Sequence, residues 1–181
     1  MRTVYEIDPT HSSVLFSVRH LMVSNVRGSF TSVKGSVAYD PADPASTTVT
    51  ATIDASTIHT HDEKRDEHLR SAEFLDVAKF PTLEFKSTSV KKTGDTEFEV
   101  TGNLSVHGVT KPVTFKVEDV SPEAKDPWGN TRIGAMAKAK LKRSDFGLTW
   151  NAPLETGGVL VGDEVKLDFE LEFIQAKSAA A

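Results

Sequence analysis

The chain of 181 residues contains no cysteine, no long apolar run and no large excess of charge of either sign. Without cysteine it forms no disulfide, thiol nucleophile or thiolate metal site. Without about 18 consecutive apolar residues it has no predicted membrane-spanning helix. Its 21 Lys and Arg against 26 Asp and Glu give a net charge of -5, whereas binding to nucleic acid needs a positive field. We therefore expect no nucleic-acid partner and no membrane span.

The amino-terminal residues lack the apolar core and the cleavage site of a secretory signal peptide. This absence predicts a cytoplasmic protein, or a periplasmic or secreted one if a leader has been removed. The composition shows no break and no linker along the chain, so we expect a single domain over residues 1–175. The small residues at 176–181 predict a disordered tail.

A period of two in hydrophobicity dominates the sequence. Phe16 and Val18, for example, alternate with polar residues, which is typical of an antiparallel strand with one buried face. The pattern predicts nine strands, at residues 3–8, 12–20, 27–40, 47–54, 82–90, 97–107, 112–120, 132–142 and 163–174. The segment 27–40 is long and contains Gly28 and Gly35, which indicates bulges or a sharp bend at a barrel corner.

A single segment has a helical pattern. Residues 62–72 contain strong helix formers and no Gly or Pro, with Thr60 or Asp62 available as the N-cap. Their few apolar residues suit a helix that covers one end of a barrel but not a helix that forms a core layer. Many strands in hairpin succession with one helix predict an all-β fold, either a sandwich or a closed barrel. A barrel of about eight strands has an interior that side chains fill or that holds one small ligand.

The residues show no strong catalytic or metal-binding motif. His59, His61 and His68 could bring three rings near carboxylates, but their spacing matches no strong zinc motif, and a solvated helix start explains them better. The sequence has no Gly-x-Ser-x-Gly elbow and no phosphate-binding loop. We therefore expect no metal, no cofactor and no catalytic residue.

Three polar side chains are candidates for contact with the head group of a ligand. His20 shares the inward face of its strand with Phe16 and Val18, where a hollow interior leaves its ring few protein partners. Arg65 and Arg143 lie at the ends of elements, where a guanidinium suits a phosphate or carbonyl group. A surface ion pair or a turn network is the simpler interpretation of each arginine.

Asp66 is expected to have a structural role. Successive residues of a helix point in different directions, so Asp66 points away from Arg65 and His68. We expect its carboxylate to pair with a backbone group or with a basic residue of the barrel.

The order of short motifs along the chain resembles the YceI family, also called the polyisoprenoid-binding proteins. The opening block is Tyr5-x-Ile7-Asp8-x-x-His11-Ser12-x-Val14-x-Phe16-x-Val18-x-His20. Later blocks include Arg65-Asp66-x-His68-Leu69-Arg70-Ser71, Gly102-x-Leu104-x-Val106-His107-Gly108-Val109-Thr110-Lys111-Pro112-Val113 and Arg143-x-Asp145-Phe146-Gly147. The match runs in order from about residue 4 to about residue 174 with matching gaps, which makes the resemblance highly specific.

The resemblance implies an antiparallel eight-stranded β-barrel like that of a lipocalin, with a short helix packed at one end. It also implies an apolar tunnel that binds or transports a long-chain amphiphile, such as a polyisoprenoid, an isoprenoid quinone or a fatty acyl or amide chain. No enzymatic activity is established for the family as a class. Its members often pair as dimers, so the resemblance suggests a homodimer, which the sequence itself neither supports nor opposes.

The alternation predicts that the large apolar side chains of the strands face the interior, and the resemblance implies that they contact the ligand. The predicted ligand-binding residues are Phe16, Val18, His20, Phe30, Ile53, Phe85, Leu104, Phe115, Phe169, Leu171, Arg65 and Arg143. Two alternatives remain. One is an enzyme that acts on a small amphiphile through His and Arg at the barrel mouth, and the other is a filled barrel that serves as an interaction module. The pattern does not distinguish a prenyl from an acyl chain, since each buried CH₂ contributes about 0.8 kcal/mol in both.

Overall fold

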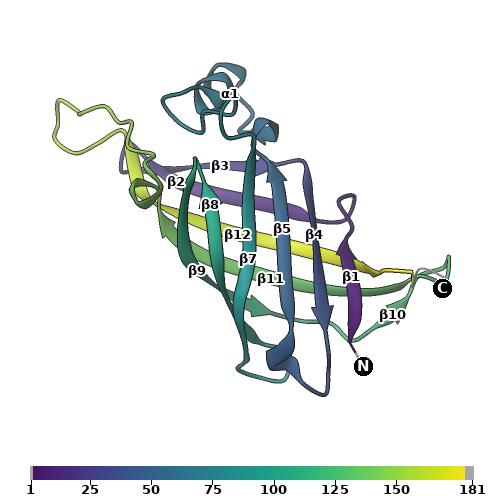
Figure 1. The fold of residues 1–181 in the computed structure, drawn as a ribbon. Helices are drawn as coiled ribbons and strands as arrows, with labels where there is room; N and C mark the ends of the chain where they lie inside the picture. Colours follow the sequence, from purple (N-terminus) through teal and green to yellow (C-terminus); the bar gives the residue numbers. More distant parts are fainter. Residues whose placement is uncertain (1, 178–181) are drawn as a thin grey trace.

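The alternating segments form strands of one continuous antiparallel sheet in the computed structural model, which describes residues 2–177 (Figure 1). The strands are β1 (Thr3–Ile7), β2 (Ser13–His20), β3 (Ser24–Phe30), β4 (Val33–Tyr39), β5 (Thr48–Asp54), β6 (Ile58–His59), β7 (Thr82–Lys92), β8 (Phe98–Val106), β9 (Val109–Glu118), β10 (Ala124–Lys125), β11 (Thr131–Lys142) and β12 (Val161–Gln175). The helix α1 spans Glu63–Arg70, and short 3₁₀ turns lie at η1 (Pro44–Ser46), η2 (Ala55–Thr57) and η3 (Arg143–Phe146).

The sheet closes on itself through the long strand β12. One edge of β12 pairs with β11 along eleven residue pairs, from Arg132↔Ile174 to Lys142↔Glu164. Its other edge pairs first with β2 and then with β1, so that β1 and β2 act as one interrupted barrel strand. In the same way β4 and β3 pair with β1 and β2, and β5 and β6 pair with β4 and β3. These three composite strands join β7, β8, β9, β11 and β12, and the predicted eight-stranded barrel is confirmed.

The predicted strand at 27–40 is two strands, and its glycines are not bulges. The interruption falls at Thr31 and Ser32, between β3 and β4. Gly28 and Gly35 lie inside regular pairing instead, where a Cβ atom at Gly28 would lie 2.4 Å from the ring of Phe16. At Gly35 a Cβ would lie 2.3 Å from the backbone oxygen of Thr50. Both glycines therefore permit a close approach that any side chain would block.

Helix α1 covers one end of the barrel, at the top of Figure 1. Asp62 is its N-cap, because its carboxylate accepts the backbone N–H of Arg65 at 3.0 Å. The helix ends at Arg70, two residues before the predicted end, because Ser71 takes an extended conformation. No helix among residues 2–177 is long and apolar enough to cross a membrane.

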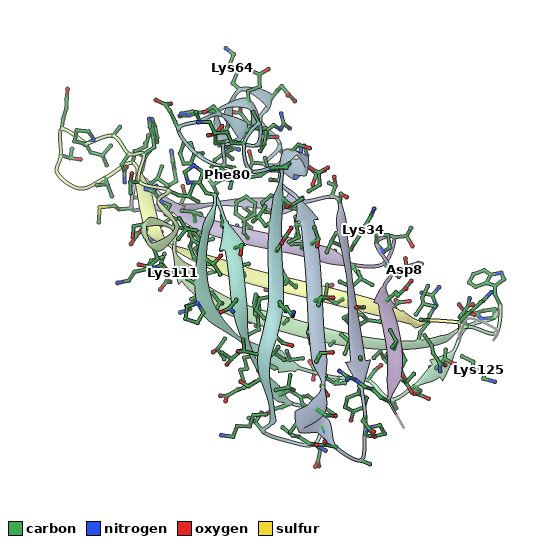
Figure 2. The ribbon with its side chains drawn as sticks, in the orientation of Figure 1. Asp8, Lys34, Lys64, Phe80, Lys111 and Lys125 are labelled. Carbon is green, nitrogen blue, oxygen red and sulfur yellow. The ribbon has the colours of Figure 1, made fainter. Side chains whose placement is uncertain are left out.

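The two ends of the barrel differ in what covers them. We call the end beneath α1 the α1 end, and the opposite end, with η1, the turn at 93–97 and the start of β1, the η1 end (Figure 1). Lys64 marks the first of these ends in Figure 2, at the top of the view, and Lys125 of β10 lies at the lower right. The backbone N–H of Ala176 still donates to the carbonyl of Val4, so this first residue of the predicted tail continues the pairing. Residues 178–181 of that tail lie outside the described residues.

Candidate functional site

A cavity of about 1260 Å³ occupies the interior of the barrel. Pockets for drug-sized ligands measure about 300–1,000 Å³, so this cavity has room for a larger molecule. The three polar residues predicted to contact a ligand, His20, Arg65 and Arg143, line this cavity. So do all nine predicted apolar residues: Phe16, Val18, Phe30, Ile53, Phe85, Leu104, Phe115, Phe169 and Leu171. An interior hollowed to this extent excludes the alternative of a barrel filled by its own side chains.

The alternation along each strand explains why these side chains face inward. On β12 the residues Phe169 and Leu171 line the cavity, whereas Asp168 and Glu170 are exposed outside. The structure also shows which of the lining residues pack in the hydrophobic core, which the pattern alone does not show. Phe115 is only 7% exposed and lies within the packed core as well as the cavity wall, and its ring contacts those of Phe85 and Phe169 at centroid distances of 5.2 and 5.6 Å.

Arg143 lies at the α1 end of the cavity, with most of its donors already engaged by the protein. Its Nε donates to the carbonyl of Gly162 at 2.8 Å, and one Nη donates to Leu148 and Trp150 at 2.7 and 2.9 Å. The other Nη donates to Val161 at 3.2 Å. Burial lowers the pKa of the guanidinium. Arg143 thus holds the loop 147–162 against the barrel, and its predicted contact with a head group stays a prediction.

Arg65 and Asp66 both form hydrogen bonds with Thr60. The Nε of Arg65 donates to Oγ1 of Thr60, and its Nη donates to the carbonyl of Thr60, both at 2.7 Å. Asp66 is 1% exposed, and its carboxylate accepts both the backbone N–H and the hydroxyl of Thr60. The expected pairing of Asp66 with a backbone group is confirmed, and its structural role stays a prediction.

His20 differs from both arginines, because its ring has no hydrogen-bond partner among residues 2–177. It is half-buried and lines the cavity. It pairs across strands with Val161, whose carbonyl Arg143 holds, so His20 and Arg143 lie close in the fold. The ring of Trp150, whose carbonyl Arg143 also holds, contacts His68 of α1 at 4.7 Å. His20, Arg65 and Arg143 therefore belong to the same end of the barrel.

Sequence reasoning missed two groups of lining residues. At the α1 end, His68, Phe74 and Trp150 form a cluster with ring centroids 4.7–5.3 Å apart. Phe74 and Trp150 lie in loops, where no period marks a side chain as inward. At the η1 end, Tyr5 and Thr47 line the cavity. The inward face of β1 is the signal that could have found Tyr5, whereas Thr47 lies between η1 and β5, outside the alternation.

The three histidines considered for zinc do not converge. The Nδ1 of His59 lies 3.4 Å from Asp66, and its Nε2 lies 3.2 Å from His61. His68 instead pairs with Glu73, at 2.6 Å. Within residues 2–177, three potential ligand atoms come together only at Asp8, His11 and Glu172, on the outside near the start of β2.

Arginine already occupies that carboxylate cluster. Arg132 donates to Asp8 at 2.7 Å and also to Glu172, and its Nε donates to Asp126 at 2.8 Å. Hydrogen bonds from Thr10, Arg132 and His11 hold the pKa of Asp8 well below its usual range. We interpret the cluster as a network of ion pairs and hydrogen bonds that joins the β1–β2 linker to β11.

A closed antiparallel barrel around an apolar cavity, with polar groups gathered at its ends, defines a class of small binding barrels. Residues 5–173 match the model of the YceI-like domain, and the chain belongs to that family. Protein YceI of Salmonella newport (strain SL254) is 42% identical over 175 residues, which cover 96% of this chain and 87% of that protein.

Two solved structures share the fold. The crystal structure of Burkholderia cenocepacia BcnA superposes with a TM-score of 0.80 at 23% identity, covering 92% of this chain and 98% of that one. A polyisoprenoid binding domain from Saccharophagus degradans superposes with a TM-score of 0.69 at 16% identity, covering 96% and 99%. At these identities the likeness concerns the fold alone.

Proposed function

We propose that this protein binds or carries a long-chain amphiphile in its cavity without converting it chemically. The ligand is a polyisoprenoid, an isoprenoid quinone or a fatty acyl or amide chain. The observation that carries the proposal is the 1260 Å³ cavity, whose wall is made mostly of apolar side chains. Each CH₂ group that such a wall removes from water contributes about 0.8 kcal/mol, so a long chain gains affinity with length. The name of the Saccharophagus degradans domain, a polyisoprenoid binding domain, supports this class of ligand.

The charged residues of the wall support an amphiphile rather than a plain hydrocarbon. Arg19, Lys64, Arg65 and Arg143 line the cavity toward the α1 end, where His20 also faces it. Guanidinium and ammonium groups suit an anionic or carbonyl head group. A head group held there leaves the tail among the aromatic rings of the barrel centre.

Native mass spectrometry of the purified protein tests the proposal. We expect one chain-like molecule per protein, and uptake of a polyprenyl diphosphate or a fatty acid after the protein has been stripped of lipid. Ala135→Phe places a ring inside the cavity that Ala135 lines, and it should lower the bound fraction. Met136→Phe, on the next residue of β11 and outside the cavity, is the matched control.

The outcomes separate the proposal from its alternatives. A wild-type protein that carries nothing and takes up neither probe contradicts ligand binding. A prenyl diphosphate that is recovered as a changed product contradicts a purely binding role and favours the enzyme. If Ala135→Phe does not fold, Val165→Phe on β12 provides a second ring inside the same cavity.

A further inference from the structure

The η1 end of the cavity contains a buried polar group without a protein partner. Thr47 follows η1, is 9% exposed and lines the cavity. Within the part of the chain that the structure describes, its hydroxyl oxygen makes no hydrogen bond. Native proteins pair nearly all buried polar atoms, so an unpaired one facing a cavity points to a missing partner.

Further polar side chains line the same end of the cavity. Register places Thr3 opposite Tyr39 across β1 and β4, and Thr48 opposite Ala38 across β4 and β5, so Thr47 lies beside Tyr39. All four side chains at positions 3, 5, 39 and 47 line the cavity. The η1 end therefore has a polar wall, in contrast to the apolar centre of the barrel.

Tyr5 gives this wall a fixed donor and acceptor arrangement. It is 1% exposed, and its hydroxyl donates to the carboxylate of Glu123. Burial, together with Glu123, raises the pKa of Tyr5 to about 12, so the phenol keeps its proton. The second oxygen of Glu123 and the lone pairs of the phenol remain able to accept a hydrogen bond from a ligand.

The sign of the charge differs between the two ends. The Lys and Arg residues of the cavity wall within residues 2–177 are Arg19, Lys64, Arg65 and Arg143, which belong to the α1 end. Two carboxylates, Asp62 and Glu84, also line the wall toward the α1 end, so four cationic residues face two anionic ones there. At the η1 end the charged wall residues are Asp95 and Glu123, both anionic. An anionic group is therefore repelled from the η1 end, whereas an uncharged group that both donates and accepts hydrogen bonds fits it.

We propose that the η1 end is a second polar subsite, in which Thr47 and the Tyr5–Glu123 pair hold an uncharged hydroxyl or amide group of the ligand. A long-chain alcohol or amide then binds with its polar group at the η1 end and its tail toward α1. A long-chain acid binds in the opposite direction, with its carboxylate at the α1 end. This inference rests on the proposed function and adds the orientation and the class of the head group.

The test compares a long-chain primary alcohol with the fatty acid of the same length. Thr47→Val removes the hydroxyl at nearly constant volume and should weaken binding of the alcohol by roughly five- to tenfold, with the acid unaffected. Thr47→Ser keeps the hydroxyl and should retain the alcohol affinity. Thr52→Val, on the exposed face of the adjoining strand β5, is the matched control.

A second readout does not need a ligand. Because Thr47→Val removes an unpaired buried hydroxyl, it should raise the melting temperature of the ligand-free protein, while Thr52→Val should not. Thr47→Ala gives the same comparison of alcohol with acid if the valine variant does not fold.

Each outcome has one meaning. If the wild type binds both probes and Thr47→Val binds the alcohol equally well, the second subsite is wrong and the proposed function stands. If the wild type binds neither probe, the proposed function fails and the subsite fails with it. A lower melting temperature of ligand-free Thr47→Val shows that the hydroxyl has a protein partner, which also overturns the subsite.

Discussion

Polar side chains at the ends of this barrel fall into two groups according to their partners. Arg143 donates to backbone carbonyls, and Asp66 accepts the backbone N–H and the hydroxyl of Thr60, so both hold the chain in place. His20 and Thr47 have no such partner among the described residues, although both line the cavity. Unpaired polar groups next to a cavity are the ones available to a ligand.

Asp66→Asn should destabilise the protein while the cavity keeps its ligand. The amide keeps one oxygen for Thr60 but removes the negative charge that strengthens both hydrogen bonds, and its NH2 group replaces the oxygen that faces His59. The change should cost about 1–3 kcal/mol of unfolding free energy. Urea unfolding followed by circular dichroism measures the change. Glu67→Gln, on the exposed side of the same helix, is the control. Unchanged stability with loss of bound lipid would assign Asp66 to the ligand instead.

His20→Phe should reduce retention of a chain with an anionic or carbonyl head. The substitution keeps a ring of similar bulk but removes both nitrogens, and loss of one hydrogen bond should weaken binding by roughly five- to tenfold. His20→Asn keeps a donor and an acceptor, so its affinity for the ligand should lie between those of the wild type and of His20→Phe. Occupancy is read by native mass spectrometry. A folded phenylalanine variant that co-purifies with the same lipid at full occupancy would leave His20 no role in head-group contact.

At the scale of the element, the period of two was the informative signal. It predicted that Phe16 and Val18 of β2 and Phe169 of β12 face the same interior, and the structure bears this out. The break at Thr31 and Ser32 also has a signal in the sequence, because the inward positions change from even numbers in β3 (Val26, Phe30) to odd numbers in β4 (Val37, Tyr39). The prediction of one continuous strand over 27–40 overlooks this change of phase. The period could not place Trp150, since a side chain in an irregular loop has its direction set by tertiary contacts.

The network of ion pairs that joins the β1–β2 linker to β11 includes Asp8 and makes the stability of the protein depend on pH. Because the pKa of Asp8 is lower in the folded protein than its unfolded value of about 3.9, its contribution is complete above that pH. The contribution is then lost as the pH falls through the lowered folded pKa. Asp8→Asn should reduce stability at pH 7 and flatten the loss of stability on acidification.

Melting temperatures measured in steps from pH 7 to pH 2 check this prediction. Asp168→Asn is the control, because it removes an exposed carboxylate of β12 that does not pair with Arg132. Parallel acid profiles of wild type and Asp8→Asn would mean that the ion pair with Arg132 adds nothing to stability.

For the whole molecule, the fold class and the inward positions could be predicted from the sequence, but the size of the cavity could not. Alternation shows which side chains point inward, whereas a hollow depends on whether those side chains meet across the barrel. The rings of Phe85, Phe115 and Phe169 contact one another along one side of the wall, on strands β7, β9 and β12, and the cavity stays open beside them. The polarity of the two ends was equally hidden, because Tyr5, Thr47 and Glu123 are brought together by closure from distant parts of the chain.

Closure also brings the first and last strands, β1 and β12, side by side. Tyr5 pairs with Gln175, and Ala176 donates to Val4, so a short flexible linker can join the amino- and carboxyl-terminal segments without crossing the cavity. Each barrel strand then has its sequence neighbours beside it, and the order of strands becomes a cycle that can be opened at any turn. A circular permutant with new ends in the turn at 93–97 should fold and take up the same lipid. One opened inside β12, between Lys166 and Leu167, should not, because it cuts the strand that pairs on both sides.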